Sequence, residues 1–156
     1  MSEPTTGVAV RQTIVVRASQ ERAFTVFTER FDSWWPREGK SVGAAPPVAV
    51  AIEPRAGGRW YERAADGTEC SWGDVIAYEP PERIVLRWDL SAAFEPQRDA
   101  GPVVEVRFVA EGPQTTRVEL EHRGLEHYGD AAGPAADAVA GDRGWPQILA
   151  AYAAAV

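Results

Sequence analysis

The sequence predicts an α+β domain in which a curved antiparallel sheet wraps around a C-terminal helix and leaves an apolar cavity between them. Apolar and polar side chains alternate through residues 48–121, with turn signals between the runs, which indicates a series of short strands. Residues 144–156 then show the apolar spacing of a helix. A sheet with one apolar face must cover it, and this last helix is the segment available to do so.

The N-terminal part of the chain predicts one strand and one helix. Residues 10–16 alternate as a strand, and their mixed faces are typical of an edge or covered position. Ser19 offers an N-cap oxygen to a helix whose aromatic stripe consists of Phe24, Phe27 and Phe31, and which ends near the last of these. Asp32 is then expected to cap a short helical turn that Pro36 ends.

The central strands are predicted to pair with their neighbours in the chain. Short turns at Gly57-Gly58, Asp66-Gly67 and Pro80-Pro81 connect them, which favours antiparallel pairing. In the last strand, His122 shares the apolar face with Val118 and Leu120. The expected strands are residues 48–53, 59–62, 69–78, 83–90, 103–110 and 116–122.

Two biased stretches are predicted as loops, residues 39–47 and 129–141, because both are rich in Gly, Ala, Pro or Asp. Asp142 is a candidate cap for the final helix, and Pro146 is tolerable in its first turn. The apolar stripe of that helix consists of Trp145, Ile148, Leu149, Tyr152 and Val156.

A chain of 156 residues is expected to form one domain, residues 1–156, because it can bury one core but is short for two domains. Residues 1–7 lack an apolar core and are expected to be a flexible N-terminus, not a secretory signal. No run approaches the ~18 apolar residues of a spanning helix. We therefore expect no membrane span and a cytoplasmic location.

The charge balance argues against nucleic acid as a partner. Sixteen Lys and Arg residues face 23 Asp and Glu residues, which leaves a formal charge of −7 without a basic cluster. Cys70 is the only cysteine, so no intramolecular disulfide can form and a reducing compartment is the simpler interpretation.

Short motifs spread over nearly the whole chain resemble those of a known family. The chain resembles the bacterial branch of the homologues of the activator of heat-shock-protein-90 ATPase. That family lies within the START-like superfamily, which includes polyketide cyclases and the birch-pollen allergen. The motifs are Phe27-Thr28-Glu29, Trp34-Trp35-Pro36, Glu53-Pro54, Gly57-Gly58-Arg59, Trp72-Gly73-Asp74-Val75, Pro80-Pro81-Glu82-Arg83, Trp88 and Gly144-Trp145.

The resemblance implies a helix-grip fold with an internal cavity, but it does not select a function. Carriers of apolar ligands, cyclases and aromatases, and co-chaperone domains all occur on this scaffold. A true activator is expected to carry a further N-terminal domain, and a single domain of the bacterial type is expected to be without one.

Six tryptophans form an aromatic set larger than core packing strictly requires, and cavity lining explains the excess. Trp72 and Trp88 are expected as cavity walls, with plain core packing as the alternative. Trp34 and Trp35 adjoin the 39–47 loop, where one of them gates the cavity or both anchor the loop. Trp145 also suits the core. The predicted ligand-binding set is Trp34, Trp35, Trp72, Trp88, Phe108, His122, Trp145 and Leu149.

His122 has two open interpretations: it binds or protonates a ligand oxygen, or it is a core histidine with an internal partner. Its spacing from His127 does not suit two ligands on one strand face, so we expect no metal and no cofactor. Cys70 is expected as a structural thiol. Glu62 and Asp74 are expected in surface pairs with Arg59, Arg63 or Arg83, with a general-base role as the alternative.

The leading functional hypothesis is a pocket protein that binds a small hydrophobic or aromatic molecule without catalysis. The alternative is a cyclase, aromatase or hydrolase acting on a polyketide-like ligand, and the third is a co-chaperone-like interaction module. The protein is expected to be a monomer or a weak homodimer. No catalytic residue is predicted, because no recognisable catalytic constellation is present.

Overall fold

The computed structural model describes residues 8–36 and 47–156. The expected N-terminal tail and all but the last residue of the expected 39–47 loop lie outside the described residues. Within them, seven strands form one sheet in the order β1-β7-β6-β5-β4-β3-β2, and every neighbouring pair is antiparallel. The strands are β1 (Val10–Val16), β2 (Pro47–Ile52), β3 (Arg59–Ala64), β4 (Glu69–Glu79), β5 (Arg83–Arg87), β6 (Val103–Gly112) and β7 (Thr115–Arg123).

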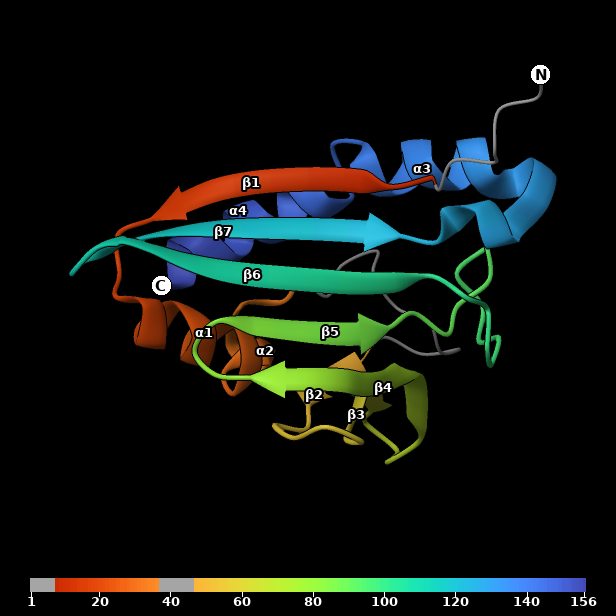
Figure 1. Ribbon diagram of the computed structural model, residues 1–156. Coiled ribbons are helices and arrows are strands. Elements are labelled where there is room, and N and C mark those ends of the chain that lie inside the picture. The colour runs from red at the N-terminus through yellow and green to blue at the C-terminus, as the bar shows by residue number, and fades with distance from the viewer. Residues whose placement is uncertain (1–7, 37–46) are drawn as a thin grey trace, which may run out of the picture.

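The sheet bends around one face, and the C-terminal helix α4 (Trp145–Ala155) runs behind β1 and β7 on that face (Figure 1). This arrangement confirms the predicted α+β helix-grip fold. The register shifts in three places along the β2 to β5 half of the sheet, at Pro47/Ala49, Trp60/Tyr61 and Val75/Ala77. Such irregularities increase local twist and bending, which helps the sheet to close over a helix.

The predicted alternation is clearest in β7, where every second residue from Thr116 to His122 is buried. The predicted strand at 83–90 is wrong in its last part, because β5 ends at Arg87. Beyond it, the Trp88 N–H donates to the Pro102 carbonyl and the Asp89 N–H to the Trp72 carbonyl, at 2.9 and 2.8 Å. The chain leaves the regular ladder there because its hydrogen bonds go to other segments.

Helix α1 (Gln20–Thr28) begins as predicted, with the Ser19 hydroxyl accepting from the Arg22 N–H at 3.2 Å. The short helix α2 (Phe31–Trp34) follows, but the expected cap role of Asp32 is wrong. Asp32 lies inside the first turn and accepts from the Val50 N–H at 2.9 Å, so it ties α2 to strand β2.

The predicted loop at 129–141 is also wrong. A 3-10 segment, η1 (Leu125–Ala131), leads into helix α3 (Ala132–Ala140). Alanine is the strongest helix former, and Pro134 sits in the first turn, where a missing N–H costs little. The expected Asp142 cap is wrong as well, because the N-cap of α4 is Gly144, whereas Pro146 lies in the first turn as predicted.

Most of the space between the sheet and the helices is filled by aromatic side chains. Phe27 of α1 lies with its ring centroid 5.2 Å from Tyr152 of α4 and 5.7 Å from Phe108 of β6. The ring centroid of Phe24 lies 5.2 Å from that of Phe108. The interior is therefore closed at this end, and the hollow lies at the other end of α4.

Candidate functional site

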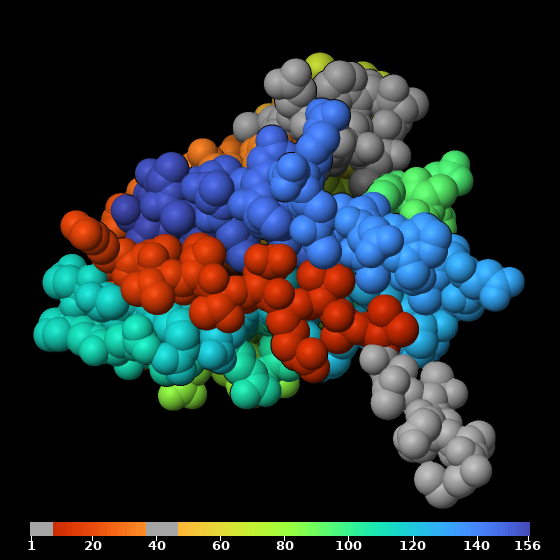
Figure 2. Space-filling model, turned by 90° about the horizontal axis from the view of Figure 1, so that it is seen from above, coloured from red at the N-terminus to blue at the C-terminus, as the bar shows by residue number. Residues whose placement is uncertain are grey.

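A pocket of about 630 Å³ opens between the loop that follows β5 and the junction of α3 with α4. Four of the six tryptophans line it, and all four are nearly buried. In the space-filling view the loop, in green, and the α3–α4 segment, in blue, lie toward the same side of the molecule (Figure 2). The lining residues are Trp35, Trp72, Trp88, Leu90, Ala93, Phe94, Glu95, Ala138, Val139, Arg143, Gly144, Trp145 and Ile148.

The four indoles come from four separate parts of the chain. Trp35 ends α2, Trp72 lies on β4, Trp88 follows β5, and Trp145 opens α4. The ring of Trp35 lies 5.1 Å from that of Trp72 and 6.3 Å from that of Trp145, and Trp145 lies 6.1 Å from Trp88. The rings therefore form one continuous aromatic wall.

Internal hydrogen bonds fix two of these indoles in place. Trp72 donates its N–H to the buried carboxylate of Glu62, and Trp145 donates to Nδ1 of His122, both at 3.0 Å. The expected surface pairing of Glu62 is thus wrong, because its side chain lies inside. Asp74 does pair with an arginine, but this is Arg87, at 3.4 Å, which lies outside the predicted set of partners. The indole N–H of Trp35 has no partner among the described residues.

His122 lies behind the wall and does not line the pocket. Its ring is fully buried, with its centroid 4.4 Å from that of Trp88. Burial lowers the pKa of His122 to about 3, so the imidazole is neutral at neutral pH. Because Nδ1 accepts from Trp145, the proton of the neutral ring is on Nε2, which has no partner among the described residues.

Three further members of the predicted set do not line the pocket either. Trp34, Phe108 and Leu149 are buried in the core, and the Trp34 N–H donates to the Val26 carbonyl at 2.8 Å. Trp35, its neighbour in the chain, is buried as well. Trp35, Trp72, Trp88 and Trp145 are thus the members of the predicted set that the structure brings together at the pocket.

Sequence reasoning missed the opposite wall. Ala138 and Val139 belong to α3, which was expected to be a loop, although the alanine content was an available helix signal. Gly144 allows α3 and α4 to meet, since a Cβ there would lie 2.1 Å from the Val139 carbonyl oxygen. Phe94 lies in an aperiodic loop, where the sequence offered no signal of its position.

The polar chemistry of the pocket is sparse. Glu95 and Arg143 are its charged lining residues, and both are exposed. The described part of the chain contains no group of three His, Cys, Asp or Glu side chains suited to hold a metal. Burial raises the pKa of the Cys70 thiol, which disfavours the reactive thiolate. No helix in residues 8–36 and 47–156 is long and apolar enough to span a membrane.

Solved structures with the same fold include two whose sequences are also similar. The anthrahydroquino-gamma-pyrone synthase Txn09, complexed with SUM, is 37% identical, with 95% of this chain and 96% of that chain covered and a TM-score of 0.65. The self-sacrificing resistance protein CalC from Micromonospora echinospora is 30% identical, with 94% and 92% covered and a TM-score of 0.67.

The fold alone is shared with more distant proteins. The Aha1 dimer from Colwellia psychrerythraea is 13% identical, with 95% of each chain covered and a TM-score of 0.61. A search of curated proteins gave no match. The family model described as activator of Hsp90 ATPase homolog 1-like protein matches residues 17–156. With nearly the whole chain matched, this protein belongs to the activator of Hsp90 ATPase homolog 1-like family.

Proposed function

We propose that the protein binds a small, planar aromatic molecule of the polyketide type in the tryptophan-walled pocket. The observation that carries the proposal is the wall itself, in which four nearly buried indoles line a hollow of about 630 Å³. Ligand pockets typically have volumes of about 300–1,000 Å³, with mostly apolar walls and few polar groups. The name of Txn09, a synthase of an anthrahydroquino-gamma-pyrone, supports a fused aromatic ring system as the ligand class.

Calorimetric titration with 1,8-dihydroxyanthraquinone, flavone and palmitate tests this proposal. We expect saturable binding of the two planar compounds with one site per chain, and weaker binding of the flexible palmitate. Ala138→Trp should abolish binding, because Ala138 lines the pocket and a new indole would fill it. Ala140→Trp places the same ring at an exposed position of α3 outside the pocket lining and should bind like the wild type.

Failure of all three compounds to bind the wild type contradicts the proposal. Equal binding by Ala138→Trp and the wild type does so as well, because it would place the ligand elsewhere.

A second candidate is catalysis of a ring closure on such a ligand, favoured by the word synthase in the name of the 37% identical Txn09. Enclosure of a reactive chain between aromatic walls would then supply orientation. The charged lining residues Glu95 and Arg143 are the candidates for proton handling. Conversion of a bound polyketide to a new mass, detected by mass spectrometry and lost in Ala138→Trp, would favour this candidate over binding alone.

A further inference from the structure

Phe94 adopts a backbone conformation that is costly for its residue type. Its φ angle is 62°, in the left-handed region that glycine enters freely and a bulky side chain rarely adopts. Asp99 is the other non-glycine residue with positive φ among those described, at 58°, and aspartate tolerates this region better. Conformations of this kind persist only where the surrounding structure imposes them, and they cluster at functional sites.

A hydrogen-bonded loop imposes this conformation. The Ser91 hydroxyl accepts from the backbone N–H groups of Ala93 and Glu95, both at 3.2 Å. The Phe94 N–H donates to the Ser91 carbonyl at 2.9 Å, and the Ser91 N–H donates to the Glu95 carbonyl at 2.7 Å. The base of the loop is closed where the Gln97 N–H donates to the Asp89 carbonyl at 2.9 Å. The loop is thus tied at both its tip and its base, and it holds Phe94 in place.

Phe94 is also far more exposed than the tryptophans that line the pocket. It is 39% exposed, whereas each of the four lining indoles is at most 8% exposed. Its centroid lies 6.4 Å from that of Trp88, with the ring planes at 79°. A flat ligand lying parallel to Trp88 would therefore meet Phe94 edge to face, an arrangement that aromatic pairs favour.

We propose that Phe94 is an aromatic clamp that covers the bound ligand at the pocket mouth and sets a preference for planar rings over flexible chains. The proposal rests on the proposed function of the pocket. The clamp accounts for the positive φ and for the exposure of Phe94. The loop holds the side chain at the pocket, and a bound ligand would bury it. The ring contacts the ligand and positions it, and no chemical step is assigned to it.

Phe94→Gly separates ligand binding from stability. Glycine relieves the positive φ, so the Tm should stay constant or rise by about 2–4 °C. The Kd for 1,8-dihydroxyanthraquinone should rise by about 10- to 100-fold, because the covering ring is gone. A purely structural residue would lower the Tm and affinity together.

Two further variants complete the test. Asp99→Gly relieves a similar φ angle at an exposed residue that does not line the pocket, so its Kd should match that of the wild type. Phe94→Leu keeps an apolar side chain without the aromatic face. It should weaken dihydroxyanthraquinone binding but leave palmitate binding unchanged.

The outcomes distinguish the two proposals. If the wild type binds none of the compounds, both proposals fall. If the wild type binds and Phe94→Gly binds equally well, the clamp is overturned and the pocket stands. A Phe94→Gly variant that loses affinity only together with several degrees of Tm also overturns the clamp.

Discussion

Three buried polar side-chain atoms have no hydrogen-bond partner among the described residues: Trp35 Nε1, Asp89 Oδ1 and His122 Nε2. An unpaired buried polar group costs about 1–3 kcal/mol, so native proteins keep few of them. Trp35 lines the pocket, His122 stands behind its wall, and Asp89 lies in the chain between two lining residues. The unpaired atoms thus gather around the candidate site, where local costs of this kind are most often retained.

His122 makes folding stability depend on pH. Its pKa is about 3 in the folded chain, against an ordinary value of 6.5. Below pH 6.5 the imidazole is therefore protonated in the unfolded chain but stays neutral in the folded chain. The contribution of the neutral His122 to the free energy of unfolding is fully present above pH 6.5. It falls as the pH decreases, by up to about 1.4 kcal/mol per pH unit. Denaturant unfolding at pH 7.5 and 5.5 should show a loss of about 1 kcal/mol in the wild type.

His122→Asn should remove this loss while keeping an acceptor for the Trp145 N–H. His127→Gln alters an exposed histidine and should leave the loss unchanged. If His122→Asn shows the same pH response as the wild type, the buried imidazole is not its source.

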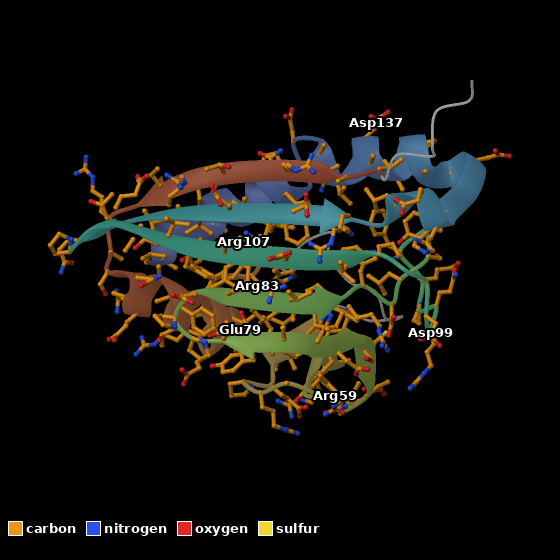
Figure 3. All side chains as sticks on the ribbon, in the orientation of Figure 1. Arg59, Glu79, Arg83, Asp99, Arg107 and Asp137 are labelled. Carbon is orange, nitrogen blue, oxygen red and sulfur yellow. The ribbon has the colours of Figure 1, made fainter. Side chains whose placement is uncertain are left out.

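At the scale of the elements, ion pairs on the outer face of the sheet link neighbouring strands. Glu105 on β6 accepts from Arg83 on β5, Arg107 on its own strand and Arg123 on β7, at 2.6, 2.7 and 2.6 Å. Arg83 and Arg107 project from neighbouring strands on this face (Figure 3). The Glu105 side chain is only 6% exposed, so this carboxylate links three strands in a largely dry setting.

Glu105→Gln should destabilise the protein by about 2–3 kcal/mol in denaturant unfolding. Breaking a buried ion pair costs about 3–5 kcal/mol, and partial exposure of the arginines reduces that cost. Glu119→Gln removes an exposed pair with Arg117 on β7 and should cost less than about 1 kcal/mol. Equal effects of the two variants would contradict a special role for Glu105.

Glu105 is also expected to make folding stability sensitive to acid. Burial raises the pKa of Glu105, but hydrogen bonds from Arg83, Arg107 and Arg123 outweigh burial and lower it to about 2. The carboxylate therefore contributes stability that is complete above pH 4.5 and is lost as the pH falls from 4.5 toward 2. The loss between pH 5 and 3 should be smaller in Glu105→Gln than in the wild type.

At the scale of the whole molecule, one hydrogen bond joins segments from opposite ends of the chain. The Tyr152 hydroxyl on α4 donates to the Ala23 carbonyl on α1 at 2.7 Å, inside the aromatic core. Burial raises the pKa of Tyr152, so the hydroxyl keeps its proton and remains a donor. This contact helps to fix the end of α4 opposite the pocket, which leaves Trp145 at the pocket end.

Tyr152→Phe should lower the free energy of unfolding by about 1 kcal/mol and the Tm by about 2–4 °C, because it removes one buried hydrogen bond and retains the ring. Tyr61→Phe on β3, where the side chain is half-buried, should change the Tm by less than 1–2 °C, an order-of-magnitude expectation from surface substitutions. Thermal unfolding followed by circular dichroism measures both. An unchanged Tm in Tyr152→Phe would show that this hydroxyl does not couple the helices.

The sequence by itself determined the features that depend on local periodicity. Two-residue alternation and short turns were sufficient to predict the antiparallel strands, and 3.6-residue spacing predicted both α1 and α4. The same rules do not predict α3, because its Gly, Ala, Pro and Asp content is typical of a loop, although alanine favours a helix. They also fail at the end of β5, where hydrogen bonds to Trp72 and Pro102 replace the ladder.

Only the tertiary structure decided which aromatic residues surround a hollow. Periodicity places a residue on a face of its own element, but it carries no information on the distance between elements. Trp35, Trp72 and Trp145 meet because the sheet bends around the start of α4, and the same bend places His122 behind them. Phe94 faces the pocket because hydrogen bonds to distant segments anchor its loop, from the Asp89 N–H to the Trp72 carbonyl and from the Tyr128 hydroxyl to the Leu90 carbonyl. No residue pattern encodes that placement.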